Sequence, residues 1–260
     1  MASTGAGYDL SPTTFSPDGR IFQVEYATKA VENAGTVVGI RCKDGVVLGV
    51  EKVMLSKMLL PSSNRRVATV ASHAGVAQAG LAADGRQVVA RARDEADNYE
   101  EVYGMKIPPQ VLAQRLSEYV HYFTIHGALR PFGTSTMIAA YDECERTHQL
   151  YVLEPTGVCL RYFGAALGKG RQSAKSEIEK LDLTQLTCRD ALKEVAKMIY
   201  TCYDESKDKP FILEMSWLCE ETGWKYELVP QDLIDGAEAW AKKELEDDDD
   251  DDDDDEEMAS

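Results

Sequence analysis

Cysteines, histidines and one lysine between glycines are the residues whose types could carry chemistry. The histidines form no HExxH pair and the cysteines no CxxC pair, so neither set has the spacing of a metal site. His121 and His126 are expected to pack or to face solvent. The six cysteines are expected to be reduced thiols, as in a protein of the cytoplasm and nucleus: Cys42, Cys144, Cys159, Cys188, Cys202 and Cys219.

The run Gly168-Lys169-Gly170-Arg171 has some of the composition of a phosphate-binding loop. It lacks the Walker spacing and the GK[ST] ending, so the pattern favours a turn between a strand and a helix. No other motif indicates a bound group. The sequence therefore predicts no cofactor and no metal.

The stretch from Tyr8 to Val31 is the most informative part of the chain. Ser16-Pro17-Asp18-Gly19 fits a type I turn, and Asp18 is then placed to cap the following helix. That helix, 19–31, is short and therefore marginal alone, so its apolar face must pack on its own sheet or on a neighbouring chain. The upstream arm has the composition of a frayed terminus. The apolar face is made by Ile21, Phe22, Val24, Tyr26, Ala30 and Val31.

The negative charge is concentrated at the C-terminal end. The chain has a net charge of −17, but the twelve consecutive acids of Glu246–Glu257 leave only −5 for the rest. Such a run repels itself, so we expect 246–260 to be a disordered tail that recruits basic partners or only keeps the protein soluble. No basic patch and no membrane-length apolar run is present, so neither nucleic acid nor a membrane is a predicted partner.

Between these ends, groups of strands alternate with pairs of helices. A hairpin is predicted at Lys43-Asp44-Gly45, and Thr187 is predicted to cap a helix with Asp190 three residues on. This order predicts an α+β fold in which helices cover two sheets. Strands are expected at 36–42, 46–50, 67–70, 74–79, 136–141, 149–154, 158–162, 211–218 and 225–229, and helices at 81–103, 110–127, 170–181, 188–206 and 230–245.

The Tyr8–Val31 block, Gly80–Arg86 and Arg130–Gly133 together resemble the alpha subunits of the 20S proteasome. The resemblance covers nearly the whole chain and implies the four-layer α/β/β/α sandwich of N-terminal-nucleophile hydrolases. It implies a gating arm and turn (1–18), a helix and linker (19–34), a sandwich domain (35–245) and the tail. The implied partners are other alpha subunits in a hetero-heptameric ring, the beta ring, and regulatory particles or activators in protein degradation.

The resemblance also implies that this chain is not catalytic. Active relatives attack with a processed N-terminal threonine whose amine serves as the base. Thr36 could do so only after cleavage, Gly35 matches the nucleophile position, and Arg66 stands where active subunits have a lysine. Arginine does not easily lose its charge in a proton network. Two alternatives remain, a hydrolase that uses Thr36 after processing and an acidic-tail adaptor outside the particle.

Two regulatory sites follow from the same resemblance. Tyr8, Asp9, Pro17 and Tyr26 would hold the arm in the open gate, whereas the residues Met1–Gly7 would cross the pore in the closed one. Packing from the helix face is the alternative role for Tyr26.

The second site is a pocket that receives the C-terminal tail of an activator. Arg66 and Gly80 would form it with Ile21 of a neighbouring subunit, and Arg66 would pair with the terminal carboxylate. The alternative for Arg66 is a surface position beside Arg65. The apolar helix is expected to contact the ring neighbour through Phe22, Val24 and Val31.

Overall fold

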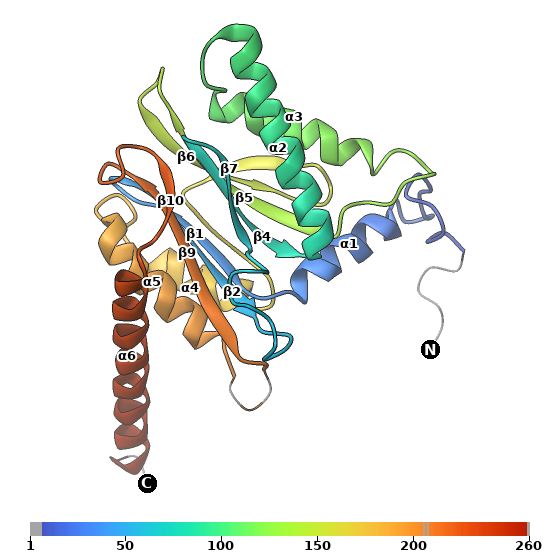
Figure 1. Cartoon of the computed structure of the whole chain (residues 1–260). Coiled ribbons are helices and arrows are strands. Elements are labelled where there is room, and N and C mark those ends of the chain that lie inside the picture. The colour runs from blue at the N-terminus through green and yellow to red at the C-terminus, as the bar shows by residue number, and fades with distance from the viewer. Residues whose placement is uncertain (1–6, 205, 207, 259–260) are drawn as a thin grey trace.

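The computed structural model describes residues 7–204, 206 and 208–258. Its centre is a pair of stacked five-stranded antiparallel sheets (Figure 1). In spatial order the first sheet contains β10 (Tyr226–Leu228), β9 (Phe211–Cys219), β2 (Gly45–Val53), β1 (Val37–Arg41) and β8 (Gly164–Leu167). The second contains β3 (Val67–Ala71), β4 (Ala74–Gly80), β5 (Thr134–Asp142), β6 (Thr147–Leu153) and β7 (Cys159–Tyr162).

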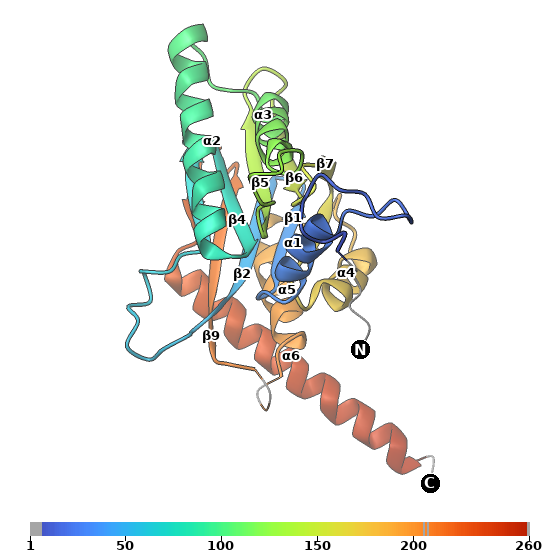
Figure 2. The same ribbon diagram turned by 90° about the vertical axis from the view of Figure 1, so that its right-hand side faces the viewer.

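Helices cover the outer face of each sheet. α2 (Ala82–Tyr103) and α3 (Pro109–Tyr122) pack on the second sheet. α4 (Arg171–Lys180) and α5 (Cys188–Thr201) pack on the first, and α6 (Gln231–Met258) packs against α5. Figure 2 shows the layers edge-on. The predicted four-layer sandwich is therefore confirmed.

Successive side chains along the strands point to opposite faces of the sheets and so fill three separate apolar layers. In β1, Val37 faces the second sheet, whereas Val38 and Ile40 face the helices of the first. All three side chains are fully buried. Both faces of this sheet are thus covered, which explains why its central strands read as continuous apolar runs rather than as alternating ones.

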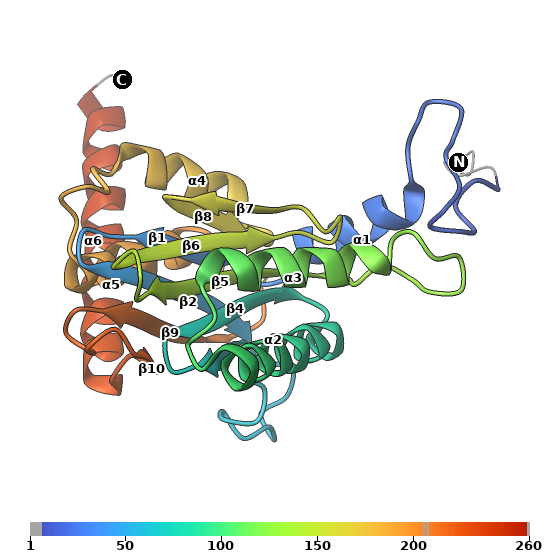
Figure 3. The same ribbon diagram turned by 90° about the horizontal axis from the view of Figure 1, so that it is seen from above.

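The N-terminal helix α1 (Phe22–Glu32) lies across one end of the sandwich, and α6 lies at the opposite end (Figure 3). A turn is present at the expected place before α1, since the Gly19 amide donates to the Ser16 carbonyl at 2.9 Å. Gly19 has a φ of +75°, which favours glycine at this position. The predicted cap by Asp18 is wrong, because Ile21 is the N-cap and no side chain caps the helix.

Three other elements differ from expectation. β8 was not predicted, and the helices predicted at 110–127 and 188–206 end earlier, at Tyr122 and Thr201. The predicted cap of α5 is confirmed, because Thr187 Oγ1 accepts the Asp190 amide at 3.2 Å.

The acidic run also departs from the sequence prediction. The pattern predicts helix only to Leu245, but α6 continues to Met258. Extending an existing helix adds one hydrogen bond per residue fixed, whereas starting a helix is costly. The acidic run is therefore helical as an extension of α6.

Candidate functional site

The N-terminal block presents a small polar cluster on the exposed side of α1. Tyr26 Oη donates to Asp9 Oδ2 at 3.3 Å, and Gln23 Nε2 donates to the Asp9 carbonyl at 2.5 Å. Desolvation, followed by the nearby Asp9 carboxylate, raises the pKa of Tyr26. Within 7–204, no hydrogen bond, ion pair or ring contact joins Tyr8 or Pro17 to this pair. The structure thus brings together two of the four predicted gate residues.

The two faces of α1 have different surroundings. Phe22 and Val31 are only 6% and 4% exposed within this single chain, whereas Tyr26 is 41% exposed. Val24 is half-buried. The side chains of Phe22 and Val31 therefore anchor α1 to its own sandwich, and the ring-contact role of this helix stays a prediction. Val24 and Tyr26 remain available for a neighbouring chain.

Arg66 lies at the rim of a small cavity with Gly80, but its own chain already binds it. Its Nη1 donates to the Gly80 carbonyl at 2.8 Å, and its backbone amide donates to Glu214 Oε2 at 2.8 Å. Burial lowers the pKa of Arg66, and the charge of Arg86 adds to this effect, while Glu214 opposes it. Ile21 of this chain does not line this cavity.

Thr36, the alternative nucleophile, is fully buried within the chain. Its nitrogen is a peptide amide that donates to Glu51 Oε2 at 2.8 Å, and its Oγ1 accepts the Gly170 amide at 3.3 Å. A Cβ on the preceding Gly35 would lie 2.3 Å from the Glu51 carbonyl oxygen. The arrangement therefore offers no free amine at Thr36 and no room for a side chain at Gly35.

The turn 168–171 packs against Ala34 and Gly35, next to Thr36. Lys169 donates its amide to the Ala34 carbonyl at 2.9 Å, and Arg171 pairs with Glu32 at 2.8 Å. A Cβ on Gly168, whose φ is +88°, would lie 2.4 Å from the Gly35 carbonyl oxygen. The turn joins β8 to α4, so the predicted turn between a strand and a helix is present. It also holds the segment that follows α1.

A charged network completes this contact. Lys169 Nζ lies 2.9 Å from Glu51 Oε1 and 2.6 Å from Asp208 Oδ2, and the Glu51 side chain is 0% exposed. Burial alone would lower the pKa of Lys169, but its bonds to Asp208 and Glu51 outweigh that effect and raise the pKa. We call the turn 168–171, together with Thr36, Glu51 and Asp208, the linker clasp.

Sequence reasoning missed Glu51 and Lys169 as members of one site. One signal was present, since Glu51 directly follows the expected strand 46–50. A carboxylate that is buried needs a partner, but the sequence alone does not name that partner.

The histidines and cysteines, which were considered first for chemistry, make ordinary contacts within the fold. His121 and His126 are both near backbone carbonyls, of Thr156 at 3.3 Å and Tyr122 at 2.7 Å. Among the described residues, no group of three or more potential ligands could hold a metal ion. In the same part of the chain, no helix is long and apolar enough to span a bilayer. Burial raises the pKa of Cys159 to about 12, so this thiol is poorly reactive.

Comparisons with known proteins agree with this geometry. Residues 8–30 match the model of the N-terminal signature of A-type proteasome subunits, and residues 31–218 match the model of the proteasome subunit. The alpha type-3 proteasome subunit of Arabidopsis thaliana is 58% identical over 247 residues, covering 95% of this chain and 98% of the relative.

Two other relatives extend this similarity. The alpha type-3 subunit of Oryza sativa subsp. japonica is 59% identical with the same coverage. The probable alpha type-7 subunit of Saccharomyces cerevisiae is 47% identical over 94% of this chain and 86% of the relative. The arm, the exposed face of α1 and the two-sheet sandwich are thus those of a chain that belongs to the proteasome subunit family, among its alpha-type members.

Proposed function

We propose that this chain is a non-catalytic gating subunit of the 20S core particle, at the seventh position of a hetero-heptameric alpha ring in the cytoplasm and nucleus. Its expected partners are the other alpha subunits, the beta ring, and regulatory particles or activators. The observation that carries the proposal is the contrast between a buried, amide-linked Thr36 and an exposed Asp9–Tyr26 pair.

The absence of catalysis rests on Thr36. An N-terminal threonine needs its own amine as the base, but this nitrogen is bonded to Gly35 and donates to a buried carboxylate. Cleavage before Thr36 would also separate α1 from the sandwich, although Phe22 and Val31 pack there. The geometry thus gives no support to the hydrolase alternative, and an intact N-terminus in a mass spectrum of the particle would reject it.

The gating role rests on the arm. Residues 1–6, the main part of the predicted closing segment, lie outside the described residues, and the chain enters α1 through the turn 16–20. The Asp9–Tyr26 hydrogen bond joins the base of the arm to the exposed face of α1. Exposed hydrogen bonds such as this one open at little cost, as the movement of a gate requires.

The proposal can be tested on particles isolated through a tag on this chain. Native mass measurement should show the chain in a full particle, whereas a lone species of about 29 kDa would favour the adaptor alternative. Deleting residues 2–9 should raise the basal hydrolysis of short fluorogenic peptides, because the arm no longer restricts entry. An unchanged basal rate in correctly assembled particles would contradict the gating role of this arm.

A further inference from the structure

A groove of about 430 Å³ opens along the edge where β3 of one sheet and β10 of the other lie together. The Tyr226 amide donates to the Ser72 carbonyl at 2.9 Å and joins the two edges beside it. The apolar part of its lining comes from both sheets and from α2: Val67, Ala68, Val89, Ala90, Tyr226 and Leu228. The groove is thus outside the linker clasp and away from the arm.

Three exposed arginines, Arg65, Arg86 and Arg93, surround this groove. Arg93 Nε donates to the Thr69 carbonyl at 2.9 Å, which holds its guanidinium at the rim. In the described part of the chain, none of the three forms an ion pair, whereas Arg20, Arg115, Arg130, Arg171 and Arg189 all do. A cluster of unpaired guanidinium groups is the arrangement that binds carboxylates.

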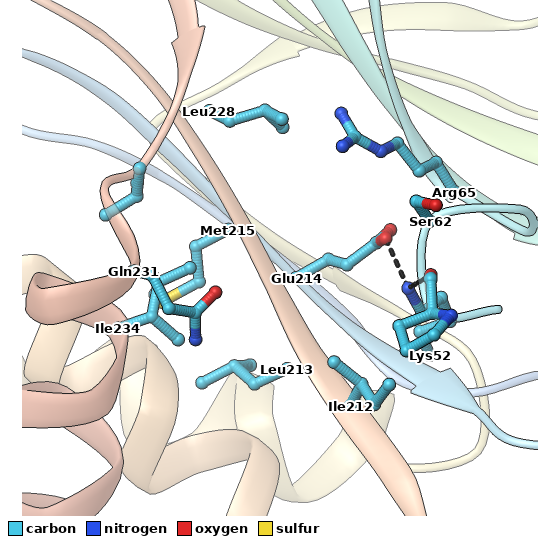
Figure 4. Close-up of a pocket in the computed structure, with 12 residues that line it drawn as sticks. Lys52, Ser62, Arg65, Ile212, Leu213, Glu214, Met215, Leu228, Gln231 and Ile234 are labelled. Atoms are coloured by element: carbon cyan, nitrogen blue, oxygen red, sulfur yellow. Dashed lines mark hydrogen bonds and ion pairs between the residues drawn. The ribbon is translucent and has the colours of Figure 1, made fainter.

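A second hollow adjoins the first and shares Arg65 and Leu228 with it. Its volume is about 220 Å³, and Figure 4 shows the side chains of Leu213, Met215 and Ile234 around it. Lys52 Nζ donates to Glu214 Oε1 and to the Pro61 carbonyl, both at 2.6 Å, so its charge is used inside the chain (Figure 4). This hollow therefore offers apolar surface beside polar groups to an incoming side chain.

We propose that the two hollows form one docking groove for an acidic segment of an adjoining proteasome subunit. Carboxylates of that segment bind Arg65, Arg86 and Arg93, and one large apolar side chain enters the hollow beside Met215. This inference rests on the proposed function, because it names a partner within the assembled particle. Complementary charge fixes the register of such a contact, and the buried apolar group supplies affinity.

The acidic run of this chain does not fit the groove. Gln231 and Ile234, at the start of α6, line the apolar hollow, and the helix then runs away from the sandwich (Figure 2). At about 1.5 Å per helical residue, the acids from Glu246 onward begin more than about 20 Å from Gln231. The acidic run of this chain is therefore not the source of the carboxylates.

Site-specific cross-linking can identify the occupant. Ala90 is exposed on α2 and lines the groove, so a benzoylphenylalanine in its place reports what lies there. In assembled particles, irradiation should link this position to a segment of another proteasome subunit that carries at least two acidic residues. A link to a neutral or basic segment, to a second copy of this chain, or no link at all would overturn the proposal.

Charge exchange provides the second measurement. Arg65→Glu with Arg86→Glu should lower the cross-linking yield about tenfold, and acid-to-lysine changes in the linked segment should restore it. Lys175→Glu on α4 is the control and should leave the yield unchanged. Lack of rescue would overturn the proposal even if the chain assembles normally. Failure of the unsubstituted chain to enter particles would instead contradict the proposed function.

Discussion

The linker clasp holds the segment that follows α1, whereas the exposed face of α1 contacts the arm that precedes it. In the clasp, Glu51 is fully buried, Lys169 bonds to two carboxylates, and glycines allow the backbones to touch. On the exposed face, Tyr26 makes one long hydrogen bond to Asp9, and Arg20 pairs with Glu25 in solvent. Burial and charged contacts hold the first side in place, whereas the second keeps polar groups that another chain can bind.

The clasp side is therefore expected to contribute stability, and the exposed face of α1 is expected to contribute function. Around Gly35 and Thr36, the segment that the resemblance aligns with the nucleophile position, the chain is held by close backbone contacts and a buried carboxylate. The exposed face contributes little to folding, because exposed hydrogen bonds and ion pairs add at most about 1 kcal/mol. Variants should therefore affect unfolding when they alter the clasp side, and gating when they alter the exposed side.

The largest effect is expected from Phe22, whose ring lies on the inner side of α1. Phe22→Ala should lower the free energy of unfolding by about 3 kcal/mol, since a buried aromatic is removed and a cavity remains. Val24→Ala, at a half-buried position of the same helix, should cost about 1 kcal/mol or less. Urea unfolding measures both. Equal losses would mean that α1 has no distinct inner face.

Lys169→Met tests the charged network of the clasp. The buried Glu51 carboxylate would lose its cation, and breaking a buried pair costs about 3–5 kcal/mol. Because Lys169 is 29% exposed, we expect a smaller loss of about 2 kcal/mol. Lys175→Met, at an exposed pair on α4, should change stability by less than about 0.5 kcal/mol. If both variants unfold at the same urea concentration, the clasp is no more stabilising than a surface ion pair.

The sequence predicted much of this fold because its signals are local. Asp44-Gly45 between β-branched runs predicted the β1–β2 hairpin, and Thr187 with Asp190 predicted the start of α5. β8 could not be found in this way, since Gly164-Ala165-Ala166-Leu167 has neither alternation nor β-branched residues. It is a strand only because it pairs with β1, where Val37 lies opposite Leu167.

The candidate site was less predictable, because its contacts join distant parts of the sequence. Periodicity showed that α1 is apolar on one side, but not that Phe22 packs inward while Tyr26 remains exposed. The pairing of Glu51 with Lys169 depends on the turn after β8. The sequence did not reveal that β8 is a strand. The resemblance identified Thr36 and Arg66 as positions to examine, and the structure supplied their bonding partners.

Acid should weaken the clasp through Asp208. Lys169, followed by a backbone bond, holds the pKa of Asp208 below its usual value of 3.8. A carboxyl with a lowered folded pKa adds stability that is present above about pH 3.8 and is lost as the pH falls through the folded pKa. The difference in unfolding free energy between the unsubstituted chain and Asp208→Asn should thus be constant near neutral pH and shrink below about pH 3.8. A difference that widens in acid would show that Lys169 does not favour the ionised form.

The smallest effect on folding, with the clearest effect on function, is expected from Tyr26→Phe. The change removes only the hydroxyl that donates to Asp9, at a position that is 41% exposed. The free energy of unfolding should therefore change by less than about 0.5 kcal/mol. If that bond helps hold the arm away from the pore, its loss should lower activator-stimulated hydrolysis of a fluorogenic peptide roughly two- to fivefold, the value of one hydrogen bond. Asp9→Asn should act in the same direction, and Tyr122→Phe, on an exposed tyrosine of α3, is the matched control. A marked loss of stability with normal hydrolysis would place Tyr26 with the packed side of α1 and remove the contrast between the two faces.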